Sequence, residues 1–411
     1  MRGRIRGDFP SREKALKDFF AEWEPKIEIE WVSISEALGR VTAKELRAIN
    51  TLPVYRSSAC DGIAVASSRF KKGVPDTSSW RLGREYERAD TGDDFRDCYD
   101  AIIPIEEVDI AEDTSIQISP DVPVKAGWNV RPKGDTLKSG DFVIKAGMII
   151  RPMDLASFAA SGITRIPVRK RPKVAFIPTG NELIPAGIRP KRGQNVDTNS
   201  ILIETSLMQM GAEPIIFPII KDDPEALEEA LRQAVARADF VILNGGTARG
   251  DEDYNFQLLE RKGKLIHHYI AAAPGRPMAF AAIEGKPVVN LPGPTIAAYF
   301  GLEWCINAVV ARCLGIPVPK RPTISCILEK EIQTKSNMAI MCLMKLTKTK
   351  NGKYHAYPQV FFEQSLTETL ASNGLYISDL GETGRKKGEI LEVELLRGEE
   401  YIEWEEENRK R

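Results

Sequence analysis

The sequence has few cysteines and almost no excess of charge. Its 411 residues include 6 cysteines, and 57 Lys and Arg residues nearly balance 58 Asp and Glu residues, for a formal net charge of -1. The cysteines are widely scattered without paired metal-ligand spacing, so neither a zinc knuckle nor a disulfide framework is indicated. The near-zero net charge gives no sign of a nucleic-acid or membrane partner.

The chain also lacks a leader pattern and long apolar runs. Arg2, Arg4 and Arg6 are followed by Asp8 and Pro10, where a signal peptide would need its apolar segment. No segment is expected to approach the roughly 20 apolar residues of a membrane span. Neither an internal repeat nor a low-complexity tract stands out. We therefore expect a cytoplasmic protein.

What is present is an ordinary globular composition, with 43% hydrophobic and 28% charged residues. Because the chain is far longer than one core usually serves, several domains are expected. Changes in composition predict a helical and linking domain at 1–50 and 150–172, a β-rich inserted domain at 51–149, an α/β domain at 173–320 and a C-terminal β domain at 321–411.

The pattern of apolar segments predicts the class of two of these domains. Strand-like and helix-like segments alternate through 173–320, which predicts a doubly wound α/β domain. Short alternating runs in 321–411, with Asn351-Gly352 as a hairpin signal, predict a small β-barrel or sandwich.

The most informative stretch is an apolar run, 240–243, that stops at Gly245-Gly246 and is followed by Asp251 and Asp253. A parallel strand covered on both faces is apolar throughout, and ligands bind beyond the carboxyl ends of such strands. Glycines let backbone N–H groups approach an anion, and alternate carboxylates can hold a hard cation such as Mg²⁺. We interpret this stretch as a buried strand that ends in a ligand loop.

The same pattern occurs earlier in the chain. The apolar run 173–177 is broken by Pro178-Thr179-Gly180, and Glu182 follows. A segment of this kind, taken alone, is about as often a plain turn with solvated charges as it is part of a binding site. Two strand ends that each carry glycine and acid favour one shared site.

Five segments in order carry a resemblance to a known family. They are Ser58-Ala-Cys-Asp-Gly-Ile-Ala64, Thr91-Gly92, Pro178-Thr-Gly-Asn-Glu-Leu183, Gly245-Gly-Thr-Ala-Arg-Gly-Asp-Glu-Asp-Tyr254, and Pro274-Gly-Arg-Pro277 followed by Leu291-Pro-Gly293. The set resembles the molybdopterin molybdenumtransferase family, which includes the MoeA proteins and the gephyrin E domain. The resemblance covers about 11–397.

The resemblance implies a homodimer that binds molybdopterin adenylylated on its phosphate, accepts molybdate, and inserts the metal with release of AMP, using Mg²⁺ or another divalent cation. It also implies handover to other cofactor-biosynthesis proteins, and a site between the pterin-binding domain of one subunit and other domains of its partner. Phosphoanhydride cleavage needs a metal to neutralise the phosphate charge, and that metal needs hard oxygen ligands.

Carried over position by position, the resemblance implies a set of site residues. The implied catalytic residues are Asp61, Thr91, Glu182, Asp222 and Asp253, and the implied metal ligands are Glu182, Asp251 and Asp253. The implied substrate-binding residues are Thr179, Gly180, Gly245, Gly246, Thr247, Arg249, Pro274, Gly275, Arg276 and Ser365. An arginine such as Arg276 can clamp a phosphate or molybdate oxyanion in a bidentate manner.

The chain also departs from the family pattern. Tyr269, Ala273 and Arg276 stand where lysines are usual, and Ala248 replaces the serine of the glycine loop. Arg249, Arg276, His267 or His268 are the cations that could substitute. Three hypotheses follow: an active insertase, a non-catalytic pterin- or nucleotide-binding carrier, sensor or scaffold, and an enzyme for another phosphoanhydride.

Overall fold

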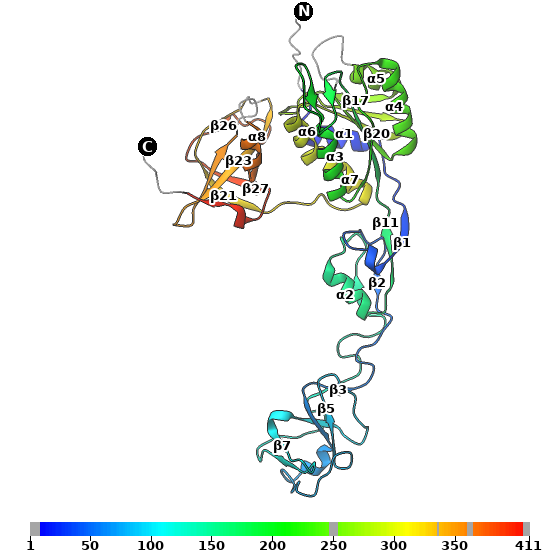
Figure 1. Cartoon of the computed structure of the whole chain (residues 1–411), viewed down its shortest axis with the longest axis vertical. Helices are drawn as coiled ribbons and strands as arrows, with labels where there is room; N and C mark the ends of the chain where they lie inside the picture. Colours follow the sequence, from blue (N-terminus) through cyan, green and yellow to red (C-terminus); the bar gives the residue numbers. More distant parts are fainter. Residues whose placement is uncertain (1–8, 246–253, 335–336, 360–364, 406–411) are drawn as a thin grey trace, which may run out of the picture. The chain divides into compact units, whose positions relative to one another are not determined.

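The computed structural model describes residues 9–245, 254–334, 337–359 and 365–405. The chain divides into two compact units (Figure 1). Unit 1 comprises Met1–Glu28 with Lys170–Arg411, and unit 2 comprises Ile29–Arg169. Unit 1 contains an α/β sheet and a C-terminal barrel, whereas unit 2 is built mainly from short strands.

The centre of unit 1 is a six-stranded sheet with the order β15-β12-β16-β20-β19-β17. The strands are β12 (Lys173–Pro178), β15 (Glu213–Ile216), β16 (Phe240–Asn244), β17 (Lys264–His268), β19 (Ala279–Ile283) and β20 (Lys286–Leu291). The first four strands in the order are parallel, and β19 is antiparallel to both of its neighbours. The predicted α/β fold is confirmed, with an antiparallel edge that the sequence pattern did not indicate.

Helices cover both faces of this sheet. They are α1 (Arg12–Ala21), α3 (Asn199–Gln209), α4 (Pro224–Arg237), α5 (Tyr254–Lys262), α6 (Thr295–Gly301) and α7 (Asn307–Leu314). Two of them begin at the caps that the sequence provides. The Ser11 hydroxyl accepts the Lys14 N–H, and the Asp223 carboxylate accepts N–H groups of Glu225 and Ala226.

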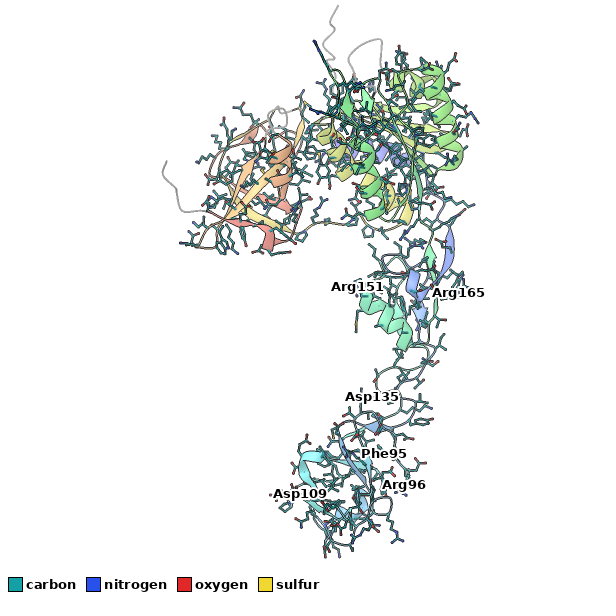
Figure 2. All side chains as sticks on the ribbon, in the orientation of Figure 1. Phe95, Arg96, Asp109, Asp135, Arg151 and Arg165 are labelled. Atoms are coloured by element: carbon teal, nitrogen blue, oxygen red, sulfur yellow. The ribbon has the colours of Figure 1, made fainter. Side chains whose placement is uncertain are left out.

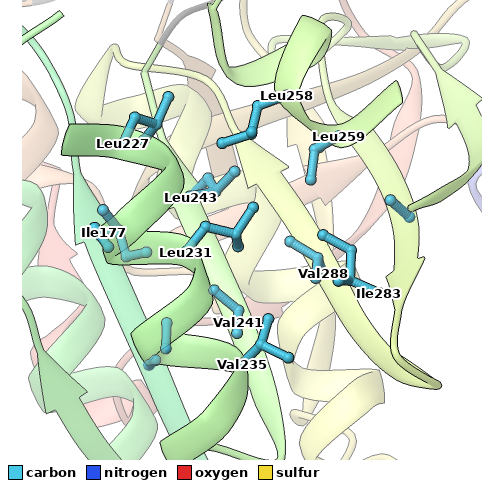
Figure 3. Packing of buried hydrophobic residues seen from close by; sticks show 14 of the residues in the cluster. Ile177, Leu227, Leu231, Val235, Val241, Leu243, Leu258, Leu259, Ile283 and Val288 are labelled. Carbon is cyan, nitrogen blue, oxygen red and sulfur yellow. The ribbon is translucent and has the colours of Figure 1, made fainter. Parts of the chain in front are cut away.

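The main core lies between the sheet and the helices α4 and α5 (Figure 3). Alternate residues of β12 and β16, such as Ile177, Val241 and Leu243, pack against Leu231 of α4 and Leu258 of α5. Because successive strand residues point to opposite faces, the intervening residues face the other helix layer. All of β16 is buried, which explains the apolar run 240–243 that precedes Asn244.

One helical stretch is long and apolar enough to be compared with a membrane span. The segment from α6 through the π-helical turn Leu302–Ile306 to α7 runs continuously from Thr295 to Leu314. It meets the length and hydropathy criteria for a membrane span, so the expectation that no segment approaches them was wrong. In this structure 67% of that window is buried inside the protein, as in a core helix.

The C-terminal part of unit 1 is a closed barrel, which decides between the two predicted forms. Its strands are β21 (Thr323–Leu328), β23 (Ala339–Lys348), β24 (Tyr354–Pro358), β25 (Gly374–Ile377) and β27 (Ile390–Leu395). The barrel closes because β23 pairs with both β24 and β25. The predicted Asn351-Gly352 hairpin joins β23 to β24, with Gly352 at φ 80°. Smaller elements are β18 (Ala272–Ala273), β22 (Ile332–Gln333), β26 (Gly384–Arg385), β28 (Glu403–Trp404), α8 (Leu366–Ala371) and a 3-10 turn (Glu399–Tyr401).

Unit 2 is formed mainly by short strands. They are β1 (Ile29–Ser33), β2 (Leu46–Arg47), β3 (Ser57–Ser58), β4 (Gly62–Val65), β5 (Tyr86–Ala89), β6 (Ala101–Pro104), β7 (Val108–Ile110), β8 (Ile116–Ile118), β9 (Val130–Arg131), β10 (Phe142–Ile144) and β11 (Arg165–Arg169). Arg151 precedes the helix α2 (Pro152–Ala160), and Arg165 begins β11, which pairs with β1 (Figure 2). A single 3-10 turn, Ile34–Glu36, follows Ser33.

Candidate active site at the carboxyl edge of the parallel strands

A cavity of about 970 Å³ lies at the carboxyl ends of β12, β16 and β20. The loops that follow these strands and the N-terminal end of α3 form its walls. Its lining residues include Thr179, Gly180, Glu182, Asp222 and Gly245, all predicted from the sequence as site residues. The structure therefore brings both glycine-containing strand ends into one cavity, as the sequence pattern indicated.

The two strand ends are in direct contact at Thr179 and Gly245. The Thr179 amide and hydroxyl both donate to the Asn244 carbonyl, at 2.9 and 3.0 Å. A Cβ atom on Gly245 would lie 2.5 Å from Thr179 Oγ1 and 2.6 Å from the Thr179 carbonyl oxygen. Gly245 also has a φ of 120°, which side-chain-bearing residues rarely adopt. Glycine is therefore required where the ligand loop begins.

A second set of contacts fixes Asp222. Its carboxylate accepts the Asn181 N–H at 3.1 Å, and its own N–H donates to the Asn181 side-chain oxygen at 3.2 Å. The Lys221 ammonium donates to the carbonyls of Asn181 and Leu183, at 3.0 and 3.1 Å. These bonds join the loop after β12 to the segment that precedes α4, so Asp222 and Glu182 are held at the same cavity.

The described lining of the cavity is acidic. It carries the carboxylates of Glu182, Asp197 and Asp222, and no described lining residue is a lysine or arginine. The sequence analysis did not select Asp197, which lies before α3 and accepts the Ser200 amide and hydroxyl. An anionic ligand in this cavity therefore meets negative charge unless a cation accompanies it.

Several predicted residues lie outside the described part of the chain. They are Gly246, Thr247, Ala248, Arg249, Asp251 and Asp253. Among the described residues, no group of three His, Cys, Asp or Glu side chains is placed to hold a metal ion.

The predicted residues Pro274, Gly275 and Arg276 line a different cavity, of about 730 Å³. The two cavities share the lining residue Pro294. The guanidinium of Arg276 lies over the ring of Phe9, with its central carbon 4.6 Å from the ring centroid. Ser365 lies elsewhere, as the cap of α8, where its hydroxyl accepts the Glu368 N–H at 3.2 Å.

The two predicted residues of unit 2 contact each other. The Thr91 amide and hydroxyl donate to one Asp61 carboxylate oxygen, at 2.7 and 2.8 Å. These hydrogen bonds, the backbone one first, lower the pKa of Asp61. The next residue must be glycine, since a Cβ on Gly62 would lie 2.0 Å from the Ile103 carbonyl oxygen. Asp61 is therefore an ionised carboxylate in a fixed position within its unit.

The two neighbouring histidines differ in environment. His267 Nε2 lies 2.8 Å from an Asp18 carboxylate oxygen. The His268 ring stacks between Phe256 and Tyr269, with centroid separations of 3.8 and 4.0 Å. Burial lowers the pKa of His268 to about 4, so this ring is neutral at pH 7 and does not replace a missing lysine.

The lowered pKa of His268 predicts how stability depends on pH. Its unfolded pKa is the ordinary 6.5, so between pH 6.5 and about 4 the unfolded state binds the extra proton. This contribution to stability is fully present above pH 6.5 and is lost as the pH falls toward 4. Urea unfolding at pH 7.5 and pH 5 should show a smaller loss for His268→Phe than for the wild type. Equal losses in the two proteins would contradict the assignment.

Sequence reasoning missed four buried asparagines at the cavity, two of which, Asn199 and Asn244, line it. Asn199, Asn244, Asn255 and Asn290 are between 1% and 6% exposed, and they are hydrogen-bonded to one another. The sequence feature that could have indicated them is an asparagine at or next to the end of an apolar strand, as in β16 and β20.

Comparison with known proteins supports one family over most of the chain. Residues 11–162 match the MoeA N-terminal region (domain I and II), and residues 175–312 match the probable molybdopterin binding domain. A molybdopterin molybdenumtransferase of Haemophilus influenzae is 29% identical over 305 residues, 71% of this chain and 75% of that protein. The corresponding protein of Bacillus subtilis is 26% identical over 396 residues, 92% of each chain.

A solved structure gives the same result for the fold. The crystal structure of a molybdopterin biosynthesis MoeA protein from Pyrococcus horikoshii is 26% identical, with a TM-score of 0.79. The match covers 95% of this chain and all of that one. It includes both matched regions and the C-terminal barrel. The chain belongs to the MoeA family, whose members carry a molybdopterin-binding domain.

Proposed function

We propose that this chain is a molybdopterin molybdenumtransferase, which inserts molybdate into adenylylated molybdopterin and releases AMP. The observation that carries the proposal is the position of the acid-lined cavity. It lies at the carboxyl edge of the parallel strands, inside the region that matches the molybdopterin-binding domain. Relatives that match this chain over most of its length are named molybdopterin molybdenumtransferase.

The chain's own residues supply binding and orientation. Gly180 and Gly245 allow the backbone to approach the ligand closely, and Thr179 fixes the distance between the two loops. Asp222 and Glu182 present carboxylates at one wall, and Asp222 is held by Asn181. We assign oxyanion contacts to Arg249 and Arg276, with Gly246, Thr247, Pro274, Gly275 and Ser365 as further binding residues.

A divalent cation, Mg²⁺ or a similar ion, is part of the proposal. Carboxylate oxygens are the ligands that hard cations prefer, and the described cavity wall carries three carboxylates. The described residues do not complete a metal site alone, so we assign Glu182 together with Asp251 and Asp253. Such an ion would supply positive charge beside the phosphates of the ligand.

We also propose a cytoplasmic homodimer that passes its product to other cofactor-biosynthesis proteins. The family resemblance supports the dimer, because it implies a site between the pterin-binding domain of one subunit and other domains of its partner. A partner subunit could contribute the Asp61 carboxylate, as the family resemblance implies. Light scattering of the purified protein tests the assembly state.

Glu182→Gln is expected to lower the rate of AMP release from adenylylated molybdopterin, with molybdate and Mg²⁺ present, by about 100-fold or more. The amide keeps the shape of the side chain and removes its negative charge. Glu204→Gln is the matched control, because Glu204 is exposed on α3 and does not line the cavity. The rate is measured by chromatography of released AMP.

Three outcomes separate the candidate functions. Release by the wild type and by Glu204→Gln, but not by Glu182→Gln, supports the transferase. Binding without release by the wild type would overturn it in favour of a carrier or sensor. Hydrolysis of simple dinucleotides without pterin binding would indicate another phosphoanhydride substrate.

A further inference from the structure

The four buried asparagines form one hydrogen-bonded network at the cavity, and Asn199 and Asn244 are among its lining residues. Asn199 donates from Nδ2 to Asn244 Oδ1 at 2.8 Å, and Asn255 donates to Asn290 Oδ1 at 3.1 Å. Thr179 connects the two pairs, because its hydroxyl donates to the Asn244 carbonyl and accepts from Asn255 Nδ2 at 3.3 Å. Each asparagine comes from a different helix or strand.

The remaining bonds of the network reach the backbone where the cavity loops begin. Asn255 and Asn290 both donate to the Gly245 carbonyl, at 3.1 and 3.2 Å. Asn244 donates to the carbonyls of Leu291 and Pro292, at 3.3 and 2.7 Å, and Asn199 donates to that of Gly293 at 2.8 Å. The loops after β16 and β20 are therefore fixed at their first residues.

A network of this kind is costly to bury unless its bonds are needed. A buried amide left without partners is destabilising, whereas the core between this sheet and the helices α4 and α5 consists of apolar side chains. The amides are neutral, so they hold the loops without adding charge to a cavity that already carries three carboxylates. The ends of β12, β16 and β20 and the first residues of α3 and α5 are thus joined by one set of hydrogen bonds.

We propose that Asn199, Asn244, Asn255 and Asn290 are positioning residues for the reaction at this cavity. They set the ends of the ligand loops before the ligand binds, so the reacting groups are in place when it arrives. The inference rests on the proposed function for its kinetic consequence. The structural part of the proposal is that these amides hold Gly245 and Gly293 in place. It can be tested without measuring turnover.

The variants Asn255→Ala, Asn290→Ala and the double variant test the proposal. Each single change should lower kcat for AMP release between about 10-fold and 100-fold, with a much smaller change in KM, because misplaced groups slow the reaction more than binding. Asn255→Ala should have the larger effect, since Asn255 also orients Asn290. The double variant should lose less than the product of the single losses.

Val288→Ala is the matched control for lost stability. Val288 is fully buried on β20, two residues before Asn290, and it packs in the core under α4 and α5. It should lower Tm and leave kcat within about twofold of the wild type at temperatures where it is folded. An equal loss of kcat in Val288→Ala, or wild-type kcat in folded Asn255→Ala, would overturn the proposal.

Two further measurements cover the remaining cases. Thr179→Val keeps the side-chain shape and removes the hydroxyl that joins the pairs, so it replaces Asn255→Ala if that variant does not fold. Hydrogen exchange of the Gly245 amide, which donates to the Leu291 carbonyl, should accelerate in the network variants and not in Val288→Ala. This readout needs no turnover, so a wild type that releases no AMP refutes the function and leaves the network testable.

Discussion

Chelating divalent cations is expected to stop AMP release and to weaken binding of adenylylated molybdopterin by more than about tenfold. The described wall of the cavity presents Glu182, Asp197 and Asp222 and no cation, whereas the ligand carries a phosphoanhydride. Like charges at close range repel unless a cation lies between them. A repulsion of only about 1.4 kcal/mol already weakens binding about tenfold. Calorimetry with and without chelator measures the effect.

A charge-neutralised variant distinguishes repulsion from a general loss of structure. In chelator, the double variant Glu182→Gln with Asp222→Asn should bind the ligand more tightly than the wild type, because two negative charges are gone. With Mg²⁺ present it should bind more weakly and release no AMP, since carboxylate oxygens are missing. Wild-type binding that is indifferent to chelator would contradict the divalent cation as part of the site.

The sequence predicted those parts of the site whose residues lie next to one another in the chain. The buried strand β16 is apolar because both faces are covered, and glycine follows because a Cβ there would collide with Thr179. Both features appear in one short window, so the strand end could be located without a structure. The same holds for Pro178-Thr179-Gly180 and for the acid at Glu182.

The part that could not be predicted depends on the fold. Asn199, Asn244, Asn255 and Asn290 are spread over about ninety positions and meet only because the parallel strands end, and α3 and α5 begin, at one edge of the sheet. Isolated asparagines are common in turns and caps, so their pattern alone gives no reason to group them. The neutral state of His268 has a similar origin, because Phe256 and Tyr269 surround its ring.

Gly245→Ala is expected to destabilise the protein by about 3 kcal/mol or more and to remove most AMP release. The added Cβ would lie 2.5 Å from Thr179 Oγ1 and 2.6 Å from the Thr179 carbonyl oxygen, at a φ of 120°. Backbone strain and overpacking each cost about 1–3 kcal/mol. Relief requires the two strand ends to separate, which also breaks the bonds from Asn255 and Asn290 to the Gly245 carbonyl.

Gly187→Ala separates this collision from the general cost of a side chain at positive φ. Gly187 has a φ of 89°, and a Cβ there would meet nothing within 4 Å. That variant should lose only about 1–2 kcal/mol and keep its turnover. Urea unfolding and AMP release are measured for both proteins. Equal losses of stability and of AMP release in Gly245→Ala and Gly187→Ala would contradict the conclusion that the close approach of the strand ends orders the cavity.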